Sequence, residues 1–190
     1  MSELKDNSTA NFGFWIYLMT DAVLFASFFA VYAVMQNNTY GGPAGIDIFD
    51  LKFVLIESLI LLTSSYTCGL TILAAKKGNK KLSLTALATT GLLGLSFLGM
   101  ELYEFSHLVN NGEGWTRSGY LTSFFGLVGL HGLHIIVGIL WLVVLKFLII
   151  KRGLTESTTN KLALFSMYWH FLDIIWIFIF TFVYGMGVIK

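Results

Sequence analysis

Two ionisable residues, His170 and Asp173, lie inside the last long apolar run of the chain, residues 162–188. They are three positions apart, and Trp169 and Trp176 are seven apart, so each pair shares one face of a helix. Ionisable side chains in a membrane-spanning helix are costly and usually face the protein interior. The spacing predicts a contact between His170 and Asp173, which either holds this helix against its neighbours or forms a proton or ligand site.

Ionisable residues also lie inside the four earlier apolar runs: Asp21, Glu57, the pair Glu101 and Glu104, and the pair His131 and His134. A di-metal carboxylate site needs about four carboxylates and two histidines, usually supplied as Glu-x-x-His repeats. The carboxylate pair here reads Glu-x-x-Glu, and His131 is expected about 16 Å inward from the face near which the two glutamates lie, at 1.5 Å per residue. A metal site would therefore require two strongly offset helices.

Haem and copper sites are also poorly matched by this chain. His131 and His134 share one helix, so they cannot flank a single iron. A copper site built on paired cysteines is excluded, because Cys68 is the single cysteine.

The composition predicts an integral membrane protein. Of the 190 residues, 56% are hydrophobic and 12% are charged, whereas soluble domains carry about 25% charged residues. The mean hydropathy is +0.74. A formal net charge of +1 argues against nucleic-acid binding, which requires a clustered basic surface. The first apolar run is about twice as long as the core of a signal peptide, which predicts a retained helix.

Five apolar runs are long enough to cross a bilayer, which takes about 20 residues. They cover residues 12–35, 52–75, 82–107, 120–150 and 162–188. We therefore predict an all-α integral membrane bundle of five transmembrane helices in one membrane domain, residues 1–190.

The charged connections predict the orientation of this bundle. Basic residues concentrate in the second and fourth connections, at Lys76, Lys77, Lys80, Lys81, Lys151, Arg152 and Lys161. The first and third connections hold little beyond Lys52 and Arg117. The positive-inside rule then places the N-terminus in the cytoplasm and the C-terminus in the periplasm.

An independent transporter is the remaining alternative from residue chemistry alone, because Asp21, the three central histidines and Asp173 resemble a proton relay. Transporters are commonly built from inverted repeats and broken helices, and neither is visible in this sequence. The other reading is a membrane subunit whose polar groups hold helices, lipids or partner subunits.

Several motifs, in order along the chain, resemble subunit III of the haem–copper terminal oxidases over residues 12–187. They are Gly13-Phe14-Trp15-Ile16-Tyr17-Leu18 with Asp21 and Phe25, Glu101-x-x-Glu104-Phe105, Gly129-x-His131-Gly132-x-His134-x-x-x-Gly138, and Tyr168-Trp169-His170-Phe171-x-Asp173-x-x-Trp176. The five-span length, the loop Gly41-Gly42-Pro43-Ala44-Gly45-Ile46-Asp47-Ile48-Phe49 and Lys151-Arg152-Gly153-Leu154-Thr155 are similar to the bacterial cytochrome o ubiquinol oxidase branch.

The resemblance implies a non-redox subunit of a proton-pumping ubiquinol oxidase in the aerobic respiratory chain, with no catalytic centre of its own. The alternative is the same subunit of a cytochrome c oxidase. Haem and copper are then held by the catalytic subunit I, and this chain binds neither haem, copper nor quinone. Expected partners are subunits I, II and a small subunit IV in the bacterial inner membrane. Phospholipids are expected in a cleft between the first two helices and the others.

The resemblance also assigns roles to residues. Asp21 matches the family's buried acid, which is more often Glu, and is the candidate for a proton role. The other polar and indole side chains are expected to form a structural or lipid- and interface-binding network: Glu57, Glu101, Glu104, His131, His134, Trp169, His170, Asp173 and Trp176.

Overall fold

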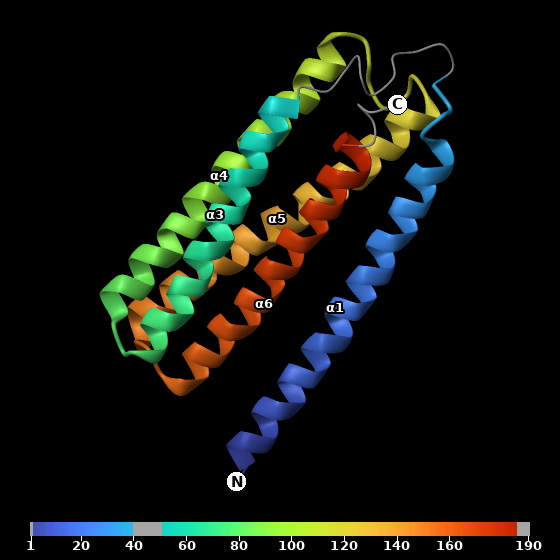
Figure 1. Cartoon of the computed structure of the whole chain (residues 1–190). Helices are drawn as coiled ribbons and strands as arrows, with labels where there is room; N and C mark the ends of the chain where they lie inside the picture. Colours follow the sequence, from blue (N-terminus) through green and yellow to red (C-terminus); the bar gives the residue numbers. More distant parts are fainter. Residues whose placement is uncertain (1, 40–50, 186–190) are drawn as a thin grey trace.

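The protein is a bundle of five long helices, shown by a computed structural model that describes residues 2–39 and 51–185 (Figure 1). The helices are α1 (Ser2–Met35), α3 (Leu51–Lys76), α4 (Lys80–Asn110), α5 (Gly119–Arg152) and α6 (Glu156–Ile179), and a π-helix η1 (Phe180–Gly185) continues α6. Each of the five long helices is long and apolar enough to cross a membrane, and no strand occurs in the described ranges. The predicted all-α bundle of five spans is confirmed.

Polar side chains set where three of these helices begin. The side chains of Asn79, Ser118 and Thr155 accept hydrogen bonds from backbone N–H groups in the first turns of α4, α5 and α6. Such N-caps satisfy donors that a helix start leaves without a partner. Gly153 ends α5 with φ +74°, a conformation that glycine adopts without strain.

The helix bounds differ from the predicted runs mainly at polar ends. Helix α1 extends back to Ser2, α4 runs on to Asn110, and α6 begins at Glu156 rather than at residue 162. Hydropathy identifies only the apolar part of a helix, and the helix can continue past that part through polar turns. Residues 186–188 of the last predicted run, and the loop motif at residues 41–49, lie outside the described residues.

Helices α3 and α4 form the most extensive contact between any two helices described. Helix α6 packs against α3, and α5 packs against α4 and α6. Helix α1 packs on α5 and α6 at the edge of the bundle (Figure 1). The expected cleft between the first two helices and the others is therefore wrong for the described residues. Helix α3 is an integral part of the bundle, whereas α1 alone lies at its side.

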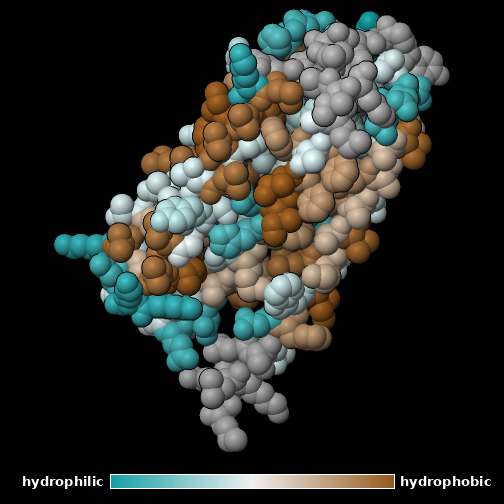
Figure 2. All heavy atoms as spheres, viewed as in Figure 1, coloured by the Kyte–Doolittle hydropathy of each residue, from teal (hydrophilic) through white to brown (hydrophobic). Residues whose placement is uncertain are grey.

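The core is aromatic. The largest fully buried side chains include Trp169, Trp176, Tyr168, Tyr184 and Phe97. Large hydrophobic side chains are exposed along the helices, and on the face shown in Figure 2 the larger groups of hydrophilic residues lie toward the two ends. At one end, the Lys80 ammonium donates a hydrogen bond to the Ile150 carbonyl over 3.1 Å, which joins the start of α4 to the end of α5.

Candidate functional site

The two indoles of α6 are bonded to serines of α3. Trp169 Nε1 donates to Ser64 Oγ over 3.0 Å, and Trp176 Nε1 donates to Ser58 Oγ over 2.9 Å. All four side chains are buried. A buried indole N–H usually finds such a partner, so the stripe predicted on α6 is matched by a row of acceptors on α3.

Two glycines leave space for the Trp169 ring. A Cβ atom built on Gly94 of α4 would lie 2.9 Å from Trp169 Cη2, and one built on Gly138 of α5 would lie 2.8 Å from Trp169 Cζ3. Both distances are shorter than real carbon–carbon contacts. The indole therefore touches the backbones of α4 and α5 while it bonds to α3, and it joins four helices at one point.

His170 and Asp173 face α3 as well. His170 Nδ1 and Ser65 Oγ are 2.6 Å apart, so the imidazole bonds to a serine across the helix interface. Asp173 is buried and interacts electrostatically with His170. Ser65 also forms a side-chain hydrogen bond with Asp173, so this serine of α3 contacts both residues of the predicted pair.

Asp21 of α1 is paired with His134 of α5. Asp21 Oδ2 lies 3.6 Å from His134 Nε2, and both side chains are about nine-tenths buried. His134 Nδ1 lies 2.8 Å from the Leu130 carbonyl of its own helix. When Nδ1–H is bonded to a carbonyl, Nε2 is left to face another group, which here is the Asp21 carboxyl. The pair therefore connects the edge helix α1 to α5.

His131 lies in an aromatic enclosure. Its ring centroid is 5.2 Å from that of Trp176, 5.9 Å from that of Phe97 and 6.4 Å from that of Phe25. The side chain is fully buried, and neither ring nitrogen has a hydrogen-bond partner among the described residues.

Three glutamates of α3 and α4 lie close together near the backbone of α5. Glu57 and Glu101 are buried, and Glu101 interacts electrostatically with both Glu57 and Glu104. Glu104 Oε2 accepts a hydrogen bond from the Tyr184 hydroxyl over 2.7 Å. The first two carboxyl groups have no hydrogen-bond partner within the described ranges.

The predicted separation of the glutamates from the histidines is wrong. A Cβ atom on Gly132 would lie 2.9 Å from Glu101 Oε1, so this carboxyl rests on the backbone beside His131. The prediction took the third span to end at residue 107, whereas α4 continues to Asn110 and carries Glu101 deeper into the bundle. Within the described residues, no group of three or more His, Cys, Asp or Glu side chains is placed to hold a metal ion.

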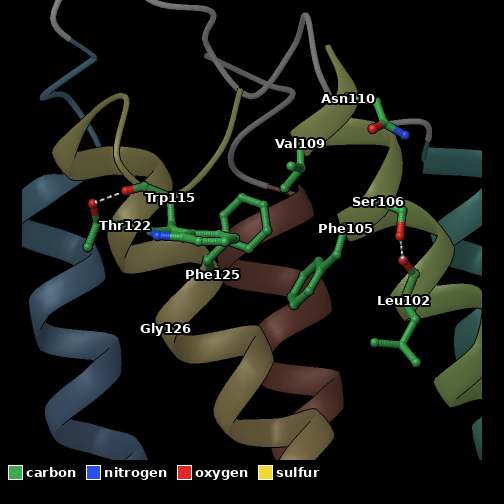
Figure 3. A pocket seen from close by; sticks show the side chains of 9 residues that line it. All are labelled: Leu102, Phe105, Ser106, Val109, Asn110, Trp115, Thr122, Phe125 and Gly126. Carbon is green, nitrogen blue, oxygen red and sulfur yellow. Dashed lines mark hydrogen bonds between the residues drawn. The ribbon is translucent and has the colours of Figure 1, made fainter. Parts of the chain in front are cut away.

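A groove of about 750 Å³ lies at one end of α4 and α5 (Figure 3). Leu102, Phe105 and Val109 of α4 face Trp115 and Phe125 across it. Polar side chains occur along the same groove at Ser106, Asn110 and Thr122. The groove thus combines an apolar lining with a polar margin at the end of the helices.

Sequence reasoning missed several residues that complete these contacts. Nothing in the spacing of the α3 serines marks them as hydrogen-bond partners of two indoles and an imidazole. Tyr184 carried no signal, because the bond that it donates to Glu104 depends on the π-helical turn at residues 180–185.

The matches of this chain to known proteins agree with the motifs. A family model described as cytochrome c oxidase subunit III matches residues 5–188. The chain is 55% identical over 176 residues to the cytochrome bo(3) ubiquinol oxidase subunit 3 of Pseudomonas aeruginosa, covering 93% of this chain and 84% of that protein. It is 49% identical to the protein of the same name from Pseudomonas putida, covering 93% and 86%.

A more distant relative is the quinol oxidase subunit 3 of Bacillus subtilis, which is 42% identical over 92% of this chain and 86% of that protein. These matches confirm the resemblance to subunit III of the haem–copper oxidases, and they extend over nearly the whole bundle. The chain belongs to the cytochrome c oxidase subunit III family.

Proposed function

We propose that this chain is the non-redox subunit III of a proton-pumping cytochrome o-type ubiquinol oxidase in the aerobic respiratory chain. The observation that carries the proposal is the 55% identity to a cytochrome bo(3) ubiquinol oxidase subunit 3 over 93% of the chain. The relatives named above from three bacteria carry ubiquinol or quinol oxidase names. The chain then acts beside a catalytic subunit I, which would hold the haem and copper, together with subunit II and a small subunit IV.

The work of this subunit would be assembly, lipid binding and stability of the catalytic subunit. The indole–serine and histidine–serine bonds between α3 and α6 support a rigid platform, because each joins side chains of two helices and the two indole–serine bonds are buried. Asp21 would have a proton role in this setting, supported by its burial and by the imidazole 3.6 Å away. The location would be the bacterial inner membrane, with the N-terminus in the cytoplasm.

The groove at the end of α4 and α5 would hold a structural phospholipid. Its apolar lining suits an acyl chain, and Trp115, an exposed indole at its margin, is the type of residue that favours the headgroup level. Substituting Ser106 by Phe would fill the groove from its edge. We expect the Ser106→Phe complex to retain less phospholipid after mild delipidation than the wild-type complex does.

Purification of the complex in mild detergent through a tag after Lys190 tests the proposal. We expect haem-bearing subunits to co-purify, with oxygen consumption driven by ubiquinol. A complex that oxidises cytochrome c and contains a subunit II with paired-cysteine copper ligands would instead support the alternative, which the family's own description favours. A lone, colourless protein, repeated in native-lipid discs, would contradict both and favour an independent membrane protein.

A further inference from the structure

The glutamates of α3 and α4 form a buried acidic cluster that the proposed roles do not use. Glu57 is 0% exposed and Glu101 is 2% exposed. Glu104, which is partly buried, is fixed by the Tyr184 hydroxyl. The cluster brings together the beginning of α3, the last third of α4 and the π-helix that follows α6.

The oxygen atoms of the two buried glutamates lack protein partners. Both oxygens of Glu57 and both oxygens of Glu101 have no hydrogen bond to any described residue. The ion pair between Asp21 and His134 involves neither of these two glutamates. Buried polar atoms of native proteins almost always have a partner, whether protein or ordered water.

A second observation lies on α5, next to the cluster. His131 is 0% exposed and both of its ring nitrogens lack partners in the described part of the chain. Its neighbour Gly132 touches the Glu101 carboxyl, and Phe97, one turn before Glu101, packs edge-on against the imidazole. Carboxyl and imidazole groups with free hydrogen-bonding capacity therefore meet in one enclosed region.

The negative charges of the three carboxyl groups determine which ligand this buried region can bind. Three carboxylates in an apolar interior would repel one another and would each lose the hydration that stabilises the charged form. A proton removes both penalties at once, and a water molecule with two to four polar partners satisfies the remaining lone pairs. Tyr184 donates to Glu104, and His131 adjoins Gly132, which the Glu101 carboxyl touches. Lys52 lies five residues before Glu57 on α3, and the pair Asp21 and His134 lies one turn along α5 from His131.

We propose that Glu57, Glu101 and Glu104 form a proton-binding site at the junction of α3, α4 and η1, in which the carboxyl groups share protons through bound water. The site is separate from the Asp21–His134 pair and stands whether the complex oxidises ubiquinol or cytochrome c. Its ligand is the proton rather than a metal ion, because the carboxyl groups are not arranged as a metal-binding set.

Infrared spectroscopy of the complex in native-lipid discs tests the site. The variants are Glu57→Gln, Glu101→Gln and Glu104→Gln, which keep the side-chain size and remove one carboxyl each. The matched control is Glu113→Gln in the loop between α4 and α5, outside the cluster. At neutral pH, we expect Glu57→Gln and Glu101→Gln each to reduce the infrared absorbance of protonated carboxyl groups by about the amount that one such group contributes. Glu113→Gln should not reduce it.

Two further measurements separate the proposal from its alternatives. Transfer to heavy water should shift the cluster's absorbance, because water connects it to the solvent. Tyr184→Phe should shift the Glu104 band to that of a carboxyl without a hydrogen-bond donor. An unchanged spectrum in all three glutamine variants, loss confined to Asp21→Asn, or displacement of the absorbance by added sodium or calcium would each overturn the proposal.

Discussion

Trp169 donates its indole N–H to Ser64 across 3.0 Å, between the centres of α6 and α3. A second indole–serine bond lies seven residues further along α6, at Trp176 and Ser58. Together they fix the register of the two helices, because a slip of one residue would leave two buried indole donors without acceptors.

Removing one acceptor should destabilise the protein without changing its shape. Ser64→Ala leaves the buried indole N–H without a partner, which costs about 1–3 kcal/mol of unfolding free energy. Thermal denaturation in lipid discs measures this as a lower melting temperature. Ser96→Ala is the matched control, because Ser96 is an exposed serine that bonds only its own helix, to Leu92. Equal melting temperatures for the two variants would show that the bond contributes nothing.

Added methyl groups at the two glycines beside Trp169 should also destabilise the bundle. Gly94→Ala and Gly138→Ala each place a Cβ atom within 3 Å of the ring, and overpacking of a dense core costs about 1–3 kcal/mol. Gly99→Ala meets no atom within 4 Å, so it should be neutral or stabilising by up to about 1 kcal/mol, the difference in helix propensity. The melting temperatures of the three variants test this order. Destabilisation by Gly99→Ala of the same size would show that ring contact is not the cause.

Gly132→Ala should act through Glu101. The new Cβ atom would lie 2.9 Å from Glu101 Oε1, so we expect the carboxyl to be displaced and the stability to fall. In a double-mutant cycle, Glu101→Ala makes room for the methyl group, and the two substitutions should couple favourably by about 0.5–3 kcal/mol. Additive effects on the unfolding free energy would contradict the direct contact.

Asp21 variants separate a structural from a proton role. Asp21→Asn keeps a polar group that can hydrogen-bond near His134 Nε2, which lies 3.6 Å from Asp21 Oδ2. Asp21→Leu removes that group and leaves a buried imidazole nitrogen unsatisfied, at about 1–3 kcal/mol. We therefore expect Asp21→Leu to melt at a lower temperature than Asp21→Asn. Because an amide exchanges no carboxyl proton, Asp21→Asn should slow sustained turnover while haem spectra stay unchanged. Wild-type turnover in Asp21→Asn would restrict the residue to a structural role.

The apolar runs were sufficient to predict the helices, because crossing a bilayer requires a length of apolar residues that sequence records directly. The offset between α4 and α5 was not predictable in this way. It depends on how far each helix continues past its apolar part, so Glu101 was expected far from the histidines and instead touches Gly132.

Contacts between helices were the second feature that the sequence did not predict. The spacing of His170 and Asp173 predicted that they share one face of a helix, but spacing within a helix does not say what that face meets. Ser65 on α3 bonds the imidazole, and its identity as a partner depends on helix packing that brings together two residues 105 positions apart in the sequence. Tyr184 was missed for the same reason, compounded by a π-helical turn with no sequence signature.

The position of α1 at the edge of the bundle has a consequence for biosynthesis. Its packing partners are α5 and α6, the last two helices to be made. At ~5–20 residues per second, α1 waits several seconds or more in the bilayer before α5 has emerged, and Asp21 meets His134 only then. The first helix inserted is thus among the last to be packed, and the half-made chain exposes an aspartic acid that requires shelter by water, lipid headgroups or another subunit.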